Sequence, residues 1–316
     1  MYGYSRVLVT EGAGFIGSHL VDRLLTEGLE VVVLDNLREG QPENVKQHIG
    51  KEDFQFVRGD IRDYNLVKNL ATDIDAVFHL AALISVPDSI RDPDLTDDVN
   101  VDGTLNLLKA FMNSSVKRFV YASSCAVYGE AESLPISEDC PLKPTSPYGV
   151  SKVAAENYVR VFCEVFGLET VCLRFFNVYG PRQAYGDYSG VITQFMNRAV
   201  KNLNLVIFGD GEQTRDFVNI RDVVEANMLA LRTKRIAGEA FNIGTGMATT
   251  INQLTNVLLE VTNKTHLKVT PSKARKGDIK YSVADISKAK MKLNYYPKVS
   301  LREGLKDLTK SFGIQK

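Results

Sequence analysis

The stretch RVLVTEGAGFIG, residues 6–17, decides the fold. It begins with a short apolar run, which is typical of a strand buried on both faces of a parallel sheet. Gly12, Gly14 and Gly17 follow at the spacing GxGxxG, and a helical pattern, GSHLVDRLLTEG, continues from the last of them. Glycines between a strand and a helix let a phosphate group approach the backbone N–H groups of the helix N-terminus. The stretch therefore predicts a dinucleotide-binding unit of strand, turn and helix.

The same alternation of strand and helix continues downstream. Helical patterns are expected near residues 93–113 and 147–167, and the second follows a proline. Short apolar strands separated by helices predict an α/β protein with a Rossmann-type, doubly wound parallel sheet. The further strands are expected in VVVLD (31–35), FQFVRGD (54–60), AVFHLAA (76–82), KRFVYASS (117–124) and TVCLRFF (170–176).

A change of rhythm after NVYGPR (177–182) predicts a second unit. Here Gly-rich and Tyr-rich loops surround a strand, VIFGDG (206–211), and a helix near 221–233. We expect residues 1–177 to form the Rossmann domain, with a return to it near 216–243. Residues 178–316 should then form mainly a smaller, mixed α/β substrate-binding domain, and a ligand should bind in the cleft between the two.

Composition excludes several classes of function. The 316 residues are 44% hydrophobic and 24% charged, which is ordinary for a globular protein. The 38 basic residues equal the 38 acidic ones, so no net charge favours nucleic acid or a membrane surface. No segment has the pattern of a leader or a membrane span, so we expect a cytoplasmic protein. The four cysteines match neither a disulfide framework nor a zinc pattern, and we expect no metal.

Polar and small residues at the ends of the predicted strands indicate where a cofactor binds. Asp35 ends the second strand about 20 residues after the glycines, where a carboxylate accepts hydrogen bonds from an adenosine ribose. This position favours NAD over its phosphorylated form. The predicted cofactor contacts at this edge of the sheet, with the turn included, are Gly12, Gly14, Phe15, Ile16, Gly17, Asp35, Asn36, Asp60, Ile61, Leu80, Ala81 and Ala82.

Tyr148 and Lys152 are the candidate catalytic pair. Four residues apart on a helix, they lie on one face. A phenol titrates near pH 10, so its pKa must fall by about 3 units before it can act as a base at neutral pH. Lys152 and a positively charged nicotinamide are the expected causes of that fall. Ser123 and Ser124 end the fifth strand, where a hydroxyl can relay the proton of a sugar.

These motifs together resemble the extended branch of the short-chain dehydrogenase/reductase superfamily, specifically the UDP-hexose 4-epimerases. The resemblance extends over nearly the whole chain, and it implies a UDP-sugar substrate, NAD, and inversion of C4 through a transient 4-keto sugar. The segments that carry it include TEGAGFIGSHLVDRLL, RGDIRD, VFHLAALISVPDSI, NVDGTLNLL, ASSCAVYG, SPYGVSK, LRFFNVYGPRQ, GDGEQTRDFVNIRDVV and RKGDIKYSVADISKA.

The resemblance also implies individual roles. Tyr148 is the base, Lys152 its partner on the nicotinamide ribose, and Ser124 the hydroxyl beside the sugar O4. Three further positions match cofactor contacts, namely Asn100, Ser123 and Phe175. The positions that match contacts to the nucleotide sugar are Ser85, Ser124, Asn177, Val191, Phe208, Arg215, Arg275, Asp278 and Ser282.

Glu11 departs from the family pattern, which has Gly at this position. A carboxylate about 4 Å from a phosphate costs up to roughly 4 kcal/mol at an effective dielectric near 20. Glu11 is therefore expected to weaken NAD binding.

Related activities remain as alternatives. Nucleotide-sugar 4,6-dehydratases and glucuronate decarboxylases need an acid just after the catalytic hydroxyl, where this chain has Cys125 and Ala126. That difference argues against both. A UDP-glucuronate 4-epimerase stays open, because it needs only a local cation for the carboxylate. A sensor that binds NAD or a nucleotide sugar without catalysis is the alternative from another class, and only Glu11 favours it.

Two further expectations concern substrate size and assembly. Ser282 stands where epimerases restricted to plain hexoses have Tyr, so the pocket should accept UDP-GlcNAc and UDP-GalNAc beside UDP-glucose and UDP-galactose. The two long helices carry more apolar residues than one sheet face can cover, which with the family's usual helix seam predicts a homodimer. The residues behind this expectation are Leu105, Leu108, Phe111, Tyr158, Phe162 and Phe166.

Overall fold

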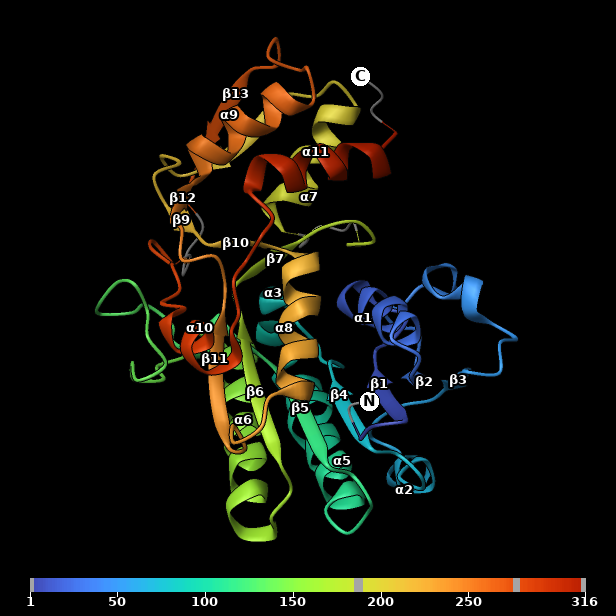
Figure 1. The fold of residues 1–316 in the computed structure, drawn as a ribbon. Helices are drawn as coiled ribbons and strands as arrows, with labels where there is room; N and C mark the ends of the chain where they lie inside the picture. The colour runs from blue at the N-terminus through green and yellow to red at the C-terminus, as the bar shows by residue number, and fades with distance from the viewer. Residues whose placement is uncertain (1–2, 185–189, 275–278, 314–316) are drawn as a thin grey trace.

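A computed structural model describes residues 3–184, 190–274 and 279–313. Within them, seven parallel strands form the central sheet in the order β11-β6-β5-β4-β1-β2-β3 (Figure 1). This order confirms the predicted Rossmann-type fold, with one strand added at the β6 edge. The strands are β1 Arg6–Thr10, β2 Glu30–Asp35, β3 Phe54–Arg58, β4 Ala76–His79, β5 Arg118–Ser124, β6 Thr170–Phe175 and β11 Glu239–Ile243.

Helices cover both faces of the sheet because its strands are apolar on both sides. Along β1, Val7 and Val9 pack into one core layer with α1 and α8, whereas Leu8 packs into the other with α2, α5 and α6. All three side chains are fully buried. The helices of these layers are α1 Phe15–Thr26, α8 Ile220–Arg232, α2 Tyr64–Leu70, α5 Gly103–Phe111 and α6 Pro147–Phe166.

The ends of α6 follow from its sequence. The Ser146 side chain accepts the N–H of Gly149 at 3.1 Å, and Pro147 occupies the first helical turn. Gly167 ends the helix with a φ of 74°, a conformation that glycine adopts without strain. Tyr148 is thereby placed in the first turn of the helix, beside the end of the sheet.

The helix expected near 93–113 contains an unexpected turn. It consists of α4 Pro93–Asp97, a π-helical turn over Asp98–Asp102 and α5. Asn100 lies in this turn, and its side chain hydrogen-bonds Leu83 and Ser151. Single π-helical turns frequently occur at functional sites.

The second region contains shorter elements around its own apolar core. α7, α9 and α11 gather at the opposite end of the molecule from α2 and α5 (Figure 1). β11 and α8 return to the first region, and β11 pairs with β6. The remaining elements are α3 Val86–Arg91, α7 Val191–Val200, α9 Ile251–Val261, α10 Ser287–Leu293, α11 Leu301–Ser311, β7 Asn177–Tyr179, β8 Leu205–Phe208, β9 Thr214–Arg215, β10 Phe217–Asn219, β12 Thr249–Thr250 and β13 Val269–Ser272.

Part of the reasoning behind the predicted dimer is wrong. Leu108, Phe111 and Phe162 are not surplus apolar residues, because they are buried between the sheet and its own helices. Leu105 packs against the same core. Tyr158 and Phe166 remain exposed, at 41% and 51%.

All four cysteines are free thiols, as the sequence predicts. In the described part of the chain, no helix is long and apolar enough to cross a membrane.

Candidate active site

The glycine-rich turn is closely packed, which explains its glycines. A Cβ on Gly17 would lie 2.0 Å from the backbone oxygen of Glu11, and a Cβ on Gly12 would lie 2.6 Å from Val33. Any larger residue at these positions would push α1 away from β1 and β2. Phe15 and Ile16 begin α1 directly after the turn, so the helix N-terminus faces the carboxyl end of the sheet. This geometry suits a phosphate.

Glu11 places a carboxylate over that turn. Its φ of 57° lies in the left-handed region, which favours glycine. Its Oε2 accepts the N–H of Ala82 at 3.2 Å, and its Oε1 lies 2.9 Å from where a Cβ on Gly14 would stand. The side chain therefore covers Gly14. Burial is the main cause that raises the pKa of Glu11 to about 8, and the charge of Asp35 contributes to the rise.

A pocket next to the turn brings together many of the predicted cofactor contacts. Asp35 lies at its edge, where its carboxylate accepts the N–H groups of Ala13 at 2.9 Å and Leu37 at 2.8 Å. Asn36 donates to Asp60 at 3.0 Å, and Arg62 lowers the pKa of Asp60 to about 2. The residues that line the pocket are Glu11, Leu34, Asp35, Asn36, Arg38, Glu39, Gly59, Asp60, Ile61, Arg62, Ala81, Ala82, Leu83 and Val99.

The chain that follows β4 is fixed by side chains of neighbouring elements. Thr10 Oγ1 accepts the N–H groups of Leu80 at 3.1 Å and Ala81 at 3.0 Å. Asn100 accepts the N–H of Leu83 at 2.7 Å. These bonds hold the backbone against the pocket, so the residues present fit a dinucleotide. Glu11 opposes its phosphates when it ionises, as the pH rises through about 8.

The candidate catalytic groups meet at the end of β5. Ser124 lies close enough to Tyr148 for its hydroxyl to lower the pKa of the phenol, and Tyr148 is buried whereas Ser124 is partly exposed. Lys152 Nζ donates to the backbone oxygen of Ala122 at 2.8 Å, and it lies 4.9 Å from the centre of the Tyr121 ring. Ser123 and Phe175, two predicted cofactor contacts, are buried at the ends of β5 and β6.

Burial favours the neutral forms of both Tyr148 and Lys152. It raises the pKa of Tyr148 to about 12, against a smaller lowering by the bond from Ser124. It lowers the pKa of Lys152 to about 8, although the charge of Glu11 opposes that shift. Tyr148 becomes a base only when further positive charge lies beside it.

Cys125 and Ala126 occupy a short 3-10 helix directly after Ser124. Burial raises the pKa of the Cys125 thiol to about 11, so it stays protonated near neutral pH. A thiol with so high a pKa is a poor acid for protonating a leaving group. The structure therefore places no carboxylic acid at the two positions that follow the catalytic hydroxyl.

The residues expected to hold a nucleotide sugar are spread over several elements. Asn177 begins β7, and its buried Oδ1 has no hydrogen-bond partner in the described part of the chain. Ser85 caps α3, where it accepts the N–H of Asp88 at 3.2 Å. Val191 begins α7, Phe208 ends β8 and Arg215 ends β9. Arg275 and Asp278 lie outside the described residues.

Asp216 was missed by the sequence reasoning, although it follows the predicted Arg215. Its buried carboxylate accepts the N–H groups of Thr245 at 2.8 Å, Gly246 at 2.9 Å and Ala284 at 3.2 Å. It thereby joins β9 to the segment of Ser282, which is itself 95% buried. The burial of Asp216 could not be predicted from the sequence. The signal that could have pointed to it is the pair Arg215-Asp216 in the segment GDGEQTRDFV.

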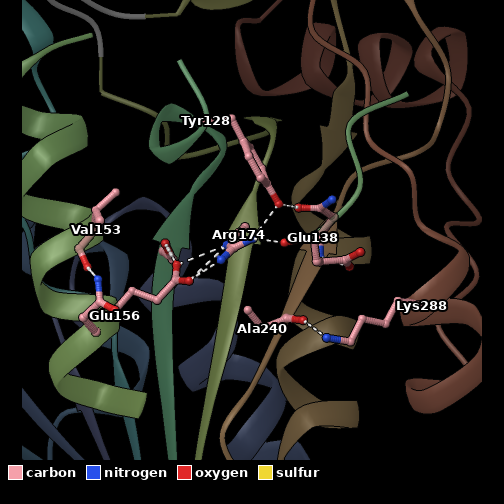
Figure 2. A network of polar contacts seen from close by, with 10 residues as sticks. Tyr128, Glu138, Val153, Glu156, Arg174, Ala240 and Lys288 are labelled. Carbon is pink, nitrogen blue, oxygen red and sulfur yellow. Dashed lines mark hydrogen bonds and ion pairs between the residues drawn. The ribbon is translucent and has the colours of Figure 1, made fainter. Parts of the chain in front are cut away.

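Figure 2 shows a second missed group, centred on Arg174 of β6 and Glu156 of α6. Glu156 follows Lys152 by four residues, and this spacing was a signal that the sequence analysis did not use. Its partner was not predictable, because Arg174 lies on a strand 18 positions away.

Comparisons with known proteins agree with this geometry. The chain matches the GDP-mannose 4,6 dehydratase family over residues 8–308. The UDP-glucose 4-epimerase of Thermotoga maritima, solved with UDP-glucose, is 41% identical, covers 98% of both chains and superposes with a TM-score of 0.92. The UDP-N-acetylglucosamine 4-epimerase of Methanobrevibacter ruminantium M1, in complex with UDP-N-acetylmuramic acid, is 37% identical over 99% of both chains, with a TM-score of 0.93.

A third similar structure has another substrate. The UDP-glucuronic acid 4-epimerase of Bacillus cereus, in complex with UDP-glucuronic acid and NAD, is 36% identical. It covers 98% of this chain and 99% of its own, with a TM-score of 0.91. Epimerases named for three different UDP-sugars thus share this fold, and their sequence identities to this chain are similar, at 41%, 37% and 36%.

Proposed function

Since the chain belongs to the GDP-mannose 4,6 dehydratase family, as its resemblance to extended short-chain dehydrogenases/reductases predicts, we propose that it is an NAD-dependent UDP-hexose 4-epimerase. The observation that carries the proposal is the placement of the Ser124 hydroxyl beside the buried Tyr148 phenol at the end of β5, with Cys125 and Ala126 after it. A base and a relay are present, and the acid of dehydration is missing. This set suits removal and return of a proton at one sugar hydroxyl.

The residues of the chain would divide the work as follows. Tyr148 takes the proton from the sugar O4, with the Ser124 hydroxyl as the relay beside it, and returns the proton to O4 at the end of the turnover. Lys152 and the positively charged nicotinamide would together supply the charge that lowers the pKa of Tyr148. NAD, held over the glycine-rich turn and by Asp35, would supply the acceptor and the later donor of the C4 hydride. The second region holds the UDP group while the 4-keto sugar presents its other face.

The proposal is tested with purified protein, NAD and separate UDP-sugars, without any added reductant. We expect UDP-glucose and UDP-galactose to be interconverted to one equilibrium mixture from either side. Conversion of UDP-glucuronate alone would favour the alternative raised by the Bacillus cereus structure. Binding of NAD and UDP-sugars without any conversion would instead favour the non-catalytic sensor.

Ser282 is proposed to set the size of the sugar pocket. Its side chain is small and buried, and the solved UDP-N-acetylglucosamine 4-epimerase shares this fold. We therefore expect the protein to process UDP-GlcNAc and UDP-GalNAc too. Room for the acetyl group is worth only about 1–3 kcal/mol of binding, so the open pocket permits these sugars without preferring them.

The variant Ser282→Tyr is expected to reduce kcat/KM for UDP-GlcNAc by at least about tenfold and to leave that for UDP-glucose within a factor of about three. The matched control is Tyr281→Ser at the neighbouring position, whose side chain is 43% exposed. If Ser282→Tyr processes UDP-GlcNAc as well as the parent does, pocket size is determined elsewhere.

We also propose that the protein is a homodimer joined through α6. This helix exposes Val150, Tyr158, Val165 and Phe166, at 50%, 41%, 66% and 51%. Light scattering at micromolar concentration should give twice the mass of one chain. The variant Val165→Glu should lower the measured mass toward that of a single chain. Val200→Glu on α7, where Val200 is 38% exposed, is the control that should stay dimeric. A monomeric parent would overturn the proposal.

A further inference from the structure

Glu156 is a buried carboxylate on the same face of α6 as Tyr148 and Lys152. Such a group is costly to bury unless hydrogen bonds and an opposite charge compensate for the lost water. Its Oε2 accepts the Ser123 hydroxyl at 2.8 Å, and both oxygens accept the Nε of Arg174 at 3.2 Å. Arg174 Nη2 completes a two-pronged ion pair with it (Figure 2).

Arg174 continues the network away from the helix. Its Nη1 donates to the Tyr128 hydroxyl at 2.7 Å and to the backbone oxygen of Glu138 at 3.2 Å (Figure 2). The Tyr128 hydroxyl in turn donates to Asn242 Oδ1 at 2.7 Å. One buried guanidinium thus joins β6 and α6 to the chain after β5 and to β11.

The network also reaches the segment that carries Ser282. Asn242 donates from Nδ2 to the backbone oxygen of Ile136 at 2.8 Å. Ile136 is paired with Ala284, two residues after Ser282, and its N–H donates to Val283 at 2.8 Å. A continuous path of polar contacts therefore runs from the catalytic helix to the proposed sugar pocket.

The contact with Ser123 is the step that links this network to the reaction. Ser123 is the residue before Ser124, so holding its hydroxyl on α6 fixes the end of β5 relative to the helix that carries Tyr148. Positioning of this kind matters because misplacement of reacting groups by 1 Å can cost about a hundredfold in rate.

We propose that Glu156 is a positioning residue of the reaction, which holds Ser123 and Arg174 so that Ser124, Tyr148 and Lys152 keep their mutual geometry. The inference rests on the proposed function. The charge of Glu156 has a second effect, since together with the charge of Glu11 it opposes the lowering of the pKa of Lys152 by burial.

The test is Glu156→Gln, assayed with NAD and UDP-glucose. We expect kcat to fall by about tenfold to a hundredfold, while KM changes by less than about threefold. The pH profile should shift too. Without the Glu156 charge the pKa of Lys152 falls further, so Lys152 loses its proton at a lower pH and the alkaline limb of kcat moves to lower pH. A role in stability alone would not move this limb.

Two further variants keep the test decisive. Ser123→Ala removes the Ser123–Glu156 bond and leaves the ion pair intact, so it should fold even if Glu156→Gln does not, and should lower kcat in the same direction. Glu164→Gln is the control, since it removes an exposed ion pair with Arg160 on the same helix and should leave kcat and the pH profile unchanged.

The outcomes separate the two proposals. A parent protein that converts no UDP-sugar overturns the proposed function, and the pH dependence of Lys152 acetylation, read by mass spectrometry, then still tests the effect of Glu156 on its pKa. If the parent is active, and both Glu156→Gln and Ser123→Ala retain its kcat and pH profile, Glu156 has no positioning role.

Discussion

Tyr148→Phe is expected to reduce turnover by several orders of magnitude, at least about a thousandfold. The variant removes only the phenolic hydroxyl, whose pKa the neighbouring Ser124 lowers. The ring remains packed in its buried place, so the affinity for UDP-glucose, measured by calorimetry, should change by less than about threefold. Loss of rate with retained binding is the result expected when a group acts mainly in the transition state.

The matched control is Tyr158→Phe, which removes a phenolic hydroxyl from an exposed side chain of the same helix. It should retain the parental rate. A Tyr148→Phe variant with activity within tenfold of the parent would show that another group is the base.

Glu11→Gly is expected to bind NAD more tightly, and the gain should grow with pH. The pKa of Glu11 is about 8 because the carboxyl is buried, so at pH 7 it is mostly protonated and opposes the phosphates little. As the pH rises through 8 the carboxylate forms beside them. The repulsion between the carboxylate and a phosphate 4 Å away then costs at most about 4 kcal/mol of NAD binding, at an effective dielectric near 20. This cost corresponds to nearly a thousandfold in affinity.

Fluorescence or calorimetric titration with NAD at pH 6.5 and 9.5 measures this effect. The parent should lose at least about tenfold in affinity between these values, whereas Glu11→Gly should lose little. Glu11→Gln separates charge from shape, because it keeps the side chain and the φ of 57° and removes the charge. If parent and glycine variant bind NAD equally at both pH values, the Glu11 carboxylate leaves the turn when the cofactor binds.

The Rossmann sheet could be predicted because its signals are local. The strand before Gly12, the spacing of the glycines and the helix after them all lie within residues 6–26, and each strand end carries its own small or polar residue. The same holds for Tyr148 and Lys152, whose spacing on one helix places them on one face.

The remaining features depend on contacts between distant segments. Lys152 bonds to the backbone of Ala122, and Glu156 pairs with Arg174 on β6, and no periodicity in the sequence specifies either partner. The direction of the Glu11 side chain depends on the N–H of Ala82, 71 positions away. The domain boundaries and the roles of the individual site residues stay predictions.

The central claim is that the hydride removed from C4 returns to the same carbon, so that only the configuration changes. The direct measurement uses UDP-glucose with deuterium at C4, incubated with the protein and NAD in ordinary water, followed by NMR and mass spectrometry. The account predicts UDP-galactose that keeps the deuterium at C4 in full. Loss of the deuterium to water, or a product that has lost water, would contradict it.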